Sequence, residues 1–445
     1  MKKFLAIILT LAMALSLVAC GGDKPEESAK PEESAKTEES AKTEESSGAD
    51  VYKIGVVLPM TGGSARMGEL QYEGMKLFAE HYNEAIGGIQ SLGGAKIELV
   101  LADSTGDPAT GASEAERLIN NEKVDALAGP YNSSVGAVMQ PIAEKYGVPF
   151  TVTNCTADNV QMTEGELKYT FRPNHSNSSN VGAILDCLAF LQEKDSSVDL
   201  SSFAIIYENT DWGNSCVDTY AAALEAAGYE MKICESFESG SADFSTIVNK
   251  IKNSGAGFIM PCMYVSDAVL FMNQYTEYGL DNALIWAGGG ILTDDFITSV
   301  GDLANNQITL NGWCVDTMAE SNDPELCDWL SERCKEDTGS ELNENVANGW
   351  IGVATLIQAV EDAGTKDKDA VAAAMKALDL GRDSLALLLH AYEGIKMGEK
   401  ETWDGSGVMQ NQNIYSAGIM TQIVDGQIRQ IYPDWSGNPL VWPVA

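Results

Sequence analysis

Positively charged residues are scarce in this sequence. It holds 28 lysine and arginine residues against 65 aspartate and glutamate residues, so its formal net charge is −37 at pH 7. Nucleic acid is bound mainly through lysine and arginine contacts to phosphate, and this charge therefore argues against a nucleic-acid partner. A large negative charge instead favours solubility near an anionic surface.

The residues and motifs of catalysis are also few. The three histidines, His81, His175 and His390, lie in no motif with serine, cysteine or carboxylate partners, and we interpret each as solvated or hydrogen-bonded. The glycine-rich motifs GxGxxG and GxxxxGK are absent, which argues against a nucleotide cofactor. Cys155 could serve as a nucleophile, but nothing in the sequence supplies its base. We therefore predict a protein that is not an enzyme and that uses no cofactor.

The cysteines have no metal-binding spacing. The sequence contains nine of them, without a C-x-x-C pair or a Cys/His cluster at zinc spacing. Most of those after Cys20 have apolar neighbours, as in DCLAF and IMPCMY, which predicts buried free thiols. Pairing of Cys216 with Cys234, or of Cys327 with Cys334, stays open. The cysteines after Cys20 are Cys155, Cys187, Cys216, Cys234, Cys262, Cys314, Cys327 and Cys334.

The chain begins with MKKFLAIILTLAMALSLVAC, which combines two lysines, an uncharged apolar run and a cysteine. This pattern predicts an export signal over residues 1–20, which is not part of the fold. The run is short for a stable membrane span, and no long apolar run follows it. The residues LVAC resemble the bacterial lipobox, which implies that Cys20 is lipidated and anchors the exported protein to the cell membrane. The alternative is an ordinary secretory peptide with a chance cysteine.

Residues 21–50 carry an acidic repeat. The unit K-P/T-E-E-S-A recurs four times and contains no aromatic or branched aliphatic residue. Such a segment cannot bury enough apolar surface to offset its chain entropy, so we predict a disordered, extended tether. A continuous charged helix is the alternative, although prolines interrupt its first half.

The remainder, residues 51–445, is longer than one hydrophobic core usually serves, so two domains are expected. The apolar segments VYKIGVVLP, KIELVLAD, DALAG and VPFTVT alternate with helical patterns, and FAIIYEN, YEMKICES, GFIMP and ALIWAGG do so again. Strands that alternate with helices of this length predict parallel βαβ units. Helices are expected across 324–363 and 368–378, and two strands about Asp425 and Gly426 predict a hairpin. The fold class is therefore α/β with two lobes.

Two polar segments, GPYNSS and TNCTAD, follow strands of the first lobe. Ligands of open parallel sheets bind beyond the carboxyl ends of the strands, where Ser133, Ser134 and Thr156 are expected. Hydroxyl groups and backbone N–H groups at a helix start suit an anion such as a carboxylate. The alternative is simple capping of the helix by Ser133 or Ser134, which leaves TNCTAD unexplained.

Several segments resemble the periplasmic leucine/isoleucine/valine-binding protein family: IGVVLPMTGGSARMGELQYEGMKLFAEHYNEAIGG, AGPYNSSVGAVMQPIAEKYGVPFTVT, FAIIYENTDWGNS, ADFSTIVNKIKNSGAGFIM and TWDGSG. The resemblance covers about residues 51–432. It implies the type I periplasmic-binding-protein fold, in which two Rossmann-like lobes with parallel sheets are joined by three crossovers. The implied lobes are 51–174 plus 312–395, and 175–311 plus 396–445. A small solute would bind in the cleft between them.

The same resemblance implies the site residues. Ser133 corresponds to a hydroxyl that binds the ligand carboxylate, and Thr156 to one that contacts the carboxylate or the amine. The aromatic residues Tyr131, Trp212 and Tyr264 suggest a ligand with an apolar or planar part, whereas Trp350 has the helical spacing of a core residue. The full implied set is Tyr131, Asn132, Ser133, Asn154, Cys155, Thr156, Trp212, Tyr264 and Gly289.

One departure from the family concerns the binding site. Members that bind amino acids carry an acidic residue after the strand that here reads LIWAGGG, whereas this chain has glycine at 288–290. An unpaired buried ammonium group would be costly. Either another carboxylate replaces the missing one, with Asp158, Asp267 and Asp294 as candidates, or the ligand lacks a free α-amine.

We predict an extracytoplasmic substrate-binding lipoprotein that delivers a small carboxylate-bearing solute to an ABC permease and ATPase complex. The solute would be a branched-chain or other amino acid, or an aromatic or deaminated acid. The alternative is a ligand-sensing module. Since the sequence contains neither a spanning helix nor an output domain, such a module would need a separate membrane receptor as its partner. A tethered surface adhesin would not explain two lobes with polar strand ends.

Overall fold

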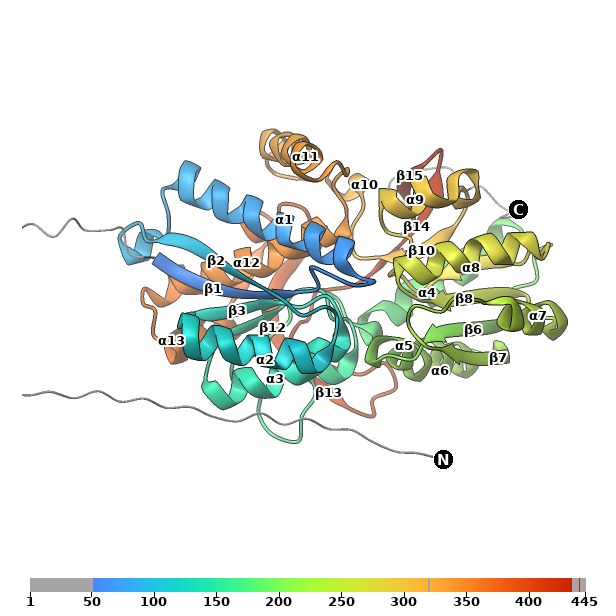
Figure 1. The fold of residues 1–445 in the computed structure, drawn as a ribbon, viewed down its shortest axis with the longest axis horizontal. Coiled ribbons are helices and arrows are strands. Elements are labelled where there is room, and N and C mark those ends of the chain that lie inside the picture. Colours follow the sequence, from blue (N-terminus) through green and yellow to red (C-terminus); the bar gives the residue numbers. More distant parts are fainter. Residues whose placement is uncertain (1–50, 319–320, 434–439, 441–445) are drawn as a thin grey trace, which may run out of the picture. The chain divides into compact units, whose positions relative to one another are not determined.

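The computed structural model of the chain describes residues 51–318, 321–433 and 440 (Figure 1). The predicted export signal, the lipidated Cys20 and the repeat tether all fall within residues 1–50, outside the described residues. Among the described residues, no helix combines the length and the apolar character needed to cross a membrane.

The first lobe is built on a five-stranded parallel sheet with the strand order β2-β1-β3-β4-β5. Alternate residues of β1 enter two different cores: Ile54 and Val56 pack with α1 and α12, whereas Val57 packs with α2 and α3. Both faces of the sheet are thus covered, as is usual for parallel sheets. The strands are β1 (Val51–Leu58), β2 (Lys96–Asp103), β3 (Ala126–Gly129), β4 (Phe150–Val152) and β5 (Thr170–Phe171). The helices are α1 (Ala65–His81), α2 (Pro108–Arg117), α3 (Ser133–Tyr146), α11 (Pro324–Thr338), α12 (Glu344–Ala363) and α13 (Lys368–Ala377).

The second lobe is built on a seven-stranded sheet with the order β15-β14-β10-β9-β8-β6-β7. Its strands from β6 to β10 run parallel, whereas β14 and β15 form an antiparallel edge. The strands are β6 (Ser202–Glu208), β7 (Glu230–Phe237), β8 (Phe258–Cys262), β9 (Ala283–Trp286), β10 (Ile308–Asn311), β14 (Ile419–Val424) and β15 (Gln427–Tyr432). The helices are α4 (Asn177–Lys194), α5 (Asp211–Cys216), α6 (Ala222–Ala226), α7 (Ser245–Ser254), α8 (Val265–Glu277), α9 (Asp294–Val300) and α10 (Val315–Met318).

The chain passes between the two large sheets three times, after β5, after β10 and after β13. A small third sheet lies before the last passage and contains β11 (Asp379–Gly381), β12 (Gly394–Glu401) and β13 (Val408–Asn413). Short 3-10 or π segments span Tyr82–Ile86, Gln90–Leu92, Leu118–Glu122, Asp158–Gln161, Val217–Ala221, Gly301–Ala304 and Leu385–Leu387.

The parallel strands in both large sheets and the three passages confirm the predicted α/β fold class. The hairpin is also confirmed, because Asp425 and Gly426 connect β14 to β15 with φ angles of 49° and 74°. The lobe boundaries stay a prediction. The boundary at residue 395 falls inside β12, and β13 forms a bridge from Gln412 to Arg172 beside β5. We therefore propose that residues 394–413 belong with the first lobe.

The cysteines of the described body are free thiols, and all except Cys234 are buried. The Cys216–Cys234 and Cys327–Cys334 pairings are therefore not formed in this structure. Trp350 is fully buried and donates its indole N–H to the Leu385 carbonyl at 2.9 Å, as expected of a core residue.

Glycine lets α1 and α12 approach closely. A methyl group added at Gly74 of α1 would lie 1.9 Å from the Val346 carbonyl oxygen of α12. A methyl group at Gly349 of α12 would lie 2.1 Å from the Gln71 carbonyl oxygen of α1. Both obstacles are backbone atoms, so any larger residue would force the two helices apart.

We predict opposite effects of two glycine-to-alanine substitutions. Gly74→Ala should lower the free energy of unfolding by about 1–3 kcal/mol, because overpacking separates α1 from α12. Gly182→Ala, at an exposed position of α4 with nothing within 4 Å of the added methyl group, should raise it by about 0.5–1 kcal/mol. Urea unfolding of both variants measures the two changes, and equal effects would contradict the close approach.

Candidate functional site

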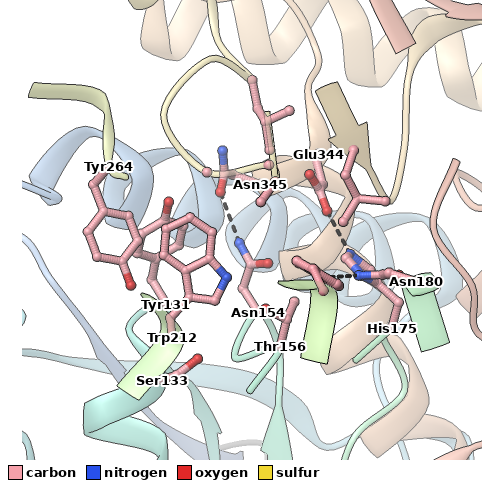
Figure 2. A pocket seen from close by; sticks show the side chains of 16 residues that line it. Tyr131, Ser133, Asn154, Thr156, His175, Asn180, Trp212, Tyr264, Glu344 and Asn345 are labelled. Carbon is pink, nitrogen blue, oxygen red and sulfur yellow. Dashed lines mark hydrogen bonds and ion pairs between the residues drawn. The ribbon is translucent and has the colours of Figure 1, made fainter. Parts of the chain in front are cut away.

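A pocket lies where the carboxyl ends of the strands of both lobes face one another (Figure 2). Its cavity volume is about 40 Å³, a few times the roughly 10–15 Å³ that one water molecule needs. In this arrangement of the lobes the pocket suits only a small occupant. It is lined by Tyr131, Ser133, Asn154, Thr156, His175, Asn180, Trp212, Tyr220, Tyr264, Ala287, Gly288, Gly289, Leu292, Leu310, Glu344 and Asn345.

The first polar segment reaches the pocket through the turn between β3 and α3. Gly129 permits this turn, because its φ is 111° and a methyl group there would lie 2.4 Å from the Val57 carbonyl oxygen. The N-cap of α3 is Asn132, and no side chain caps the helix. The hydroxyl of Ser133 instead accepts a hydrogen bond from the Ala157 N–H at 3.4 Å. Capping by Ser133 or Ser134, the simple structural alternative, is therefore not what these serines do.

The first turn of α3 is also left open to an anion. The backbone N–H groups of Ser133 and Ser134 have no hydrogen-bond partner among the described residues. Such groups at a helix start carry partial positive charge and point along the helix axis. The hydroxyl of Ser133 lies at the same end of the helix and lines the pocket.

The second polar segment contributes Asn154 and Thr156. The Asn154 side chain donates to Asn345 Oδ1 at 3.0 Å and accepts from Asn348 Nδ2 at 2.8 Å, so both of its polar atoms are already engaged. The hydroxyl of Thr156 has no hydrogen-bond partner in the described part of the chain. Thr156 is therefore the side chain of this segment that is available to a ligand.

Two predicted residues do not line the pocket. Cys155 is fully buried, its thiol lies 3.2 Å from the Asn132 carbonyl oxygen, and burial raises its pKa to about 12. A neutral, enclosed thiol packs behind the pocket and does not bind a ligand or act as a nucleophile. Asn132 directs its amide toward Ser64 Oγ at 3.3 Å. The resemblance identified the correct segment, but in a turn neighbouring side chains point to different sides.

Three aromatic rings close one side of the pocket and join the lobes. Trp212, in the first turn of α5, stacks on Tyr264 with ring centroids 5.0 Å apart and an interplanar angle of 24°. Tyr264 in turn meets Tyr131 of the first lobe at 5.4 Å. Each of the three residues is at most 7% exposed. Figure 2 shows these rings on one side of Asn154.

The glycine that replaces the family's acidic residue has a packing reason. Gly289 has a φ of 72°, and a methyl group there would lie 2.6 Å from the Cη2 atom of Trp212. A side chain at this position would displace the indole ring from its stack on Tyr264. The position of Trp212 and an acidic residue at 289 are therefore mutually exclusive in this structure.

The candidate carboxylates named from the sequence all have partners elsewhere. Asp158 accepts from the Ser178 N–H at 3.1 Å, Asp267 from the Gly240 N–H at 3.0 Å, and Asp294 from the Glu341 N–H at 2.8 Å. Asp158, Asp267 and Asp294 are not among the residues that line this pocket.

The pocket contains an acidic residue that sequence reasoning missed, Glu344. Its Oε1 atom lies 2.9 Å from His175 Nε2, and the other ring nitrogen of His175 lies 3.0 Å from Asn180 Oδ1. Figure 2 shows this chain of side chains on the side of Asn154 that faces away from the rings. The signal in the sequence was a run of three polar residues, Asn343-Glu344-Asn345, at the start of an apolar helix. In the fold all three residues are buried.

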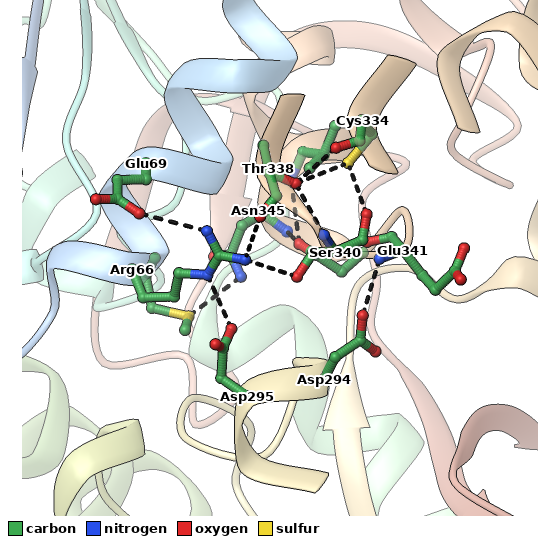
Figure 3. Close-up of polar contacts among 12 residues, drawn as sticks. Arg66, Glu69, Asp294, Asp295, Cys334, Thr338, Ser340, Glu341 and Asn345 are labelled. Carbon is green, nitrogen blue, oxygen red and sulfur yellow. Dashed lines mark hydrogen bonds and ion pairs between the residues drawn. The ribbon is translucent and has the colours of Figure 1, made fainter. Parts of the chain in front are cut away.

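Polar contacts near the start of α1 also join the two lobes (Figure 3). Arg66, at the start of α1, places its Nε 2.9 Å from Asp295 of α9 and donates from Nη2 to the Thr338 carbonyl at 3.0 Å. Nearby, the Glu341 N–H donates to Asp294. These groups are partly exposed to water, so each pair contributes only modestly to stability. They align the lobes around the pocket.

Comparisons with known proteins identify the family. Residues 51–391 match the sequence profile of the family described as periplasmic binding protein. The chain belongs to this family. The Leu/Ile/Val-binding protein homolog 7 of Brucella suis is 28% identical over 394 residues, which cover 87% of this chain and 92% of that protein. Homolog 8 of Brucella abortus is 29% identical over 396 residues, with 87% and 91% covered.

Solved structures share the fold. The leucine-binding protein LivK of Thermotoga maritima matches with a TM-score of 0.69 and 21% identity, covering 85% of this chain and 97% of that chain. LivJ of Streptococcus pneumoniae, in complex with isoleucine, matches with a TM-score of 0.68 and 20% identity, covering 85% and 98%. A solute-binding protein of R. palustris, in complex with 4-hydroxybenzoate, gives 0.66 and 20%, covering 86% and 95%.

Family membership settles the broad class of this periplasmic binding protein. Members are periplasmic solute-binding proteins and are not enzymes, which confirms the non-enzymatic prediction. Among the described residues, no cluster of histidine, cysteine and carboxylate side chains could hold a metal ion.

Glu208, at the end of β6, predicts a pH dependence of stability. Burial, together with the nearby charge of Asp267, raises its pKa to about 7, although hydrogen bonds from Ser239 and from the Tyr264 N–H act in the opposite direction. The folded protein thus keeps a proton that the unfolded chain loses near pH 4.5, so this group's contribution to stability falls as the pH rises from about 4.5 to about 7. Urea unfolding should show that Glu208→Gln gains stability relative to the parent protein over this range. The exposed Glu225→Gln is the control, and a similar gain in it would contradict the role of Glu208.

Proposed function

We propose that this periplasmic binding protein is a lipid-anchored receptor of an ABC importer that binds a small carboxylate-bearing solute in the pocket between its lobes. The observation that carries the proposal is the combination of two hydroxyl groups, on Ser133 and Thr156, with the open N–H groups of the first turn of α3. No lysine or arginine is among the residues that line this pocket.

Hydrogen-bond donors without a formal positive charge suit a carboxylate. Backbone N–H groups at a helix start and adjacent hydroxyls can bind an anion without a basic side chain. Arg172, a buried guanidinium that follows β5, donates to the carbonyl oxygens of Cys155 and Ala157 at 2.8 Å each. These bonds hold the second polar segment in place. Arg172 does not line the pocket, so a ligand carboxylate would contact the hydroxyls and not the guanidinium.

The aromatic rings and the small cavity restrict the rest of the solute. Tyr131, Trp212 and Tyr264 offer an apolar wall to a hydrocarbon or planar group. The relatives named above were solved with isoleucine and with 4-hydroxybenzoate, which are both small carboxylates with an apolar part. A branched-chain or other amino acid, or an aromatic acid, fits this description.

Removal of either hydroxyl should weaken binding of the carboxylate. A charge-assisted hydrogen bond contributes about 1.5–3 kcal/mol, so Ser133→Ala and Thr156→Val should each raise the dissociation constant by roughly tenfold to a few hundredfold. Isothermal titration calorimetry with the acid and its neutral amide measures this effect. Thr355→Val, which removes a buried hydroxyl bonded to the Ile351 carbonyl within α12, is the matched control and should bind normally. Equal binding of acid and amide, together with a harmless Ser133→Ala change, would contradict the proposal.

Lipidation of Cys20 should decide where the protein is found. Two or more acyl chains hold a protein firmly to a membrane, whereas a cleaved secretory protein is released. We expect Cys20→Ser to move the protein from the membrane fraction to the soluble fraction, measured by fractionation and immunoblotting. Cys234→Ser, at the exposed cysteine of the body, should leave it with the membrane. Retention of the Cys20→Ser protein in the membrane would refute the lipobox interpretation.

A further inference from the structure

The strongest unassigned feature of the pocket is the free oxygen of Glu344. Both hydrogen bonds of this carboxylate end on Oε1, from His175 Nε2 at 2.9 Å and from Asn348 Nδ2 at 3.5 Å. Within the described residues, Oε2 has no hydrogen-bond partner, although the side chain is only 4% exposed and lines the pocket. Oε2 is not among the fully buried side-chain atoms, so it is open to the pocket space and can pair with a bound ligand.

The backbone around Glu344 fixes the direction of its side chain. Asn343 is the N-cap of α12, and its side chain accepts from the N–H groups of Asn345 at 3.0 Å and Val346 at 3.4 Å. Glu344 is therefore the first residue of the helix, where the helix dipole stabilises a negative charge. The side chain of Glu344 is held at a defined place on the pocket wall.

His175 holds the carboxylate from behind. A carboxylate can only accept hydrogen bonds, so the ring hydrogen that Glu344 receives must lie on Nε2 of His175. The opposite ring nitrogen contacts Asn180, whose amide also donates to Tyr220 Oη at 3.1 Å. The hydrogen bonds from Asn180 to His175 and from His175 to Glu344 fix the position of Oε1 and leave Oε2 available to a ligand in the pocket.

A ligand with only a carboxylate would not satisfy this site. It would occupy the donors at Ser133 and Thr156 but leave Oε2 of Glu344 unpaired in an enclosed pocket that no lysine or arginine lines. A ligand that also carries an ammonium group would satisfy both ends. The loop that bears the acidic residue in other members is closed to this role, because Gly289 packs against Trp212.

We propose that Glu344 binds the ammonium group of the solute, so that the pocket selects α-amino acids over acids without an amine. This inference rests on the proposed function and narrows its solute class. Glu344 takes the role of the missing acidic residue, but it lies at the start of α12 in the first lobe, whereas the acidic residue of other members follows a strand of the second lobe. His175 and Asn180 are positioning residues that act through Glu344.

The test compares α-amino acids with their deaminated analogues in the full-length protein, using calorimetry or tryptophan fluorescence. The parent protein should bind one or more amino acids and bind the corresponding deaminated acids at least roughly 30-fold more weakly, as expected when one partner of a buried charge pair is removed. Glu344→Gln should weaken amino-acid binding by a similar factor and change binding of the deaminated acid by no more than a few-fold. Asp158→Asn, which removes a buried carboxylate bonded to Ser178, is the matched control and should keep the preference of the parent protein.

Each outcome decides the matter. Deaminated acids that bind the parent protein as tightly as amino acids would overturn the role of Glu344 while leaving the carboxylate site intact, and this comparison needs no variant. Equal weakening of both ligand classes in Glu344→Gln would assign Glu344 a structural role only. Failure of every amino acid and every acid to bind the parent protein would overturn this inference and the proposed function together.

Discussion

The structure of the site depends on one packing contact, the stack of Trp212 on Tyr264 against Tyr131. It brings residues at the carboxyl ends of strands in two separate sheets into direct contact, and it forms the apolar wall of the pocket. It also constrains the backbone opposite, because only glycine at 289 leaves room for the indole ring. Under the proposed function, the polar groups that recognise the ligand come from the first lobe and from the start of α12. The aromatic wall and the glycine at 289 are thus two sides of the same packing constraint.

Much of the fold could be predicted from local sequence pattern. Alternation of apolar strands with amphipathic helices identified both parallel sheets, and the Asp425-Gly426 turn identified the hairpin. The strand β10 was missed, although it lies inside the seven-stranded sheet between β9 and β14. It is only four residues long, Ile308–Asn311, and is buried on both faces, so it has no alternation to distinguish it from a loop. The three-stranded sheet was missed because its strands lack a clear apolar pattern: β11 is three residues long and mostly exposed, and β13 reads VMQNQN.

The site could be predicted only where its residues follow a strand in sequence. Ser133, Thr156, Trp212 and Tyr264 each come directly after a strand, and all of them line the pocket. The pair of His175 and Glu344 is separated by 169 residues, and neither residue lies in a motif that suggests the other. Only the return of α12 to the first lobe brings them together. The orientation of Cys155 away from the pocket likewise depends on the turn geometry and not on residue type.

The central claim is that a zwitterionic solute lies between the hydroxyls of the first lobe and Glu344. A crystal structure of the protein with the amino acid that most raises its melting temperature tests this claim most directly. We predict that the solute carboxylate lies within about 3 Å of the Ser133 and Thr156 hydroxyls and that its ammonium group lies at a similar distance from Glu344. A solute bound outside this pocket, or bound in it without contact to these groups, would contradict the account.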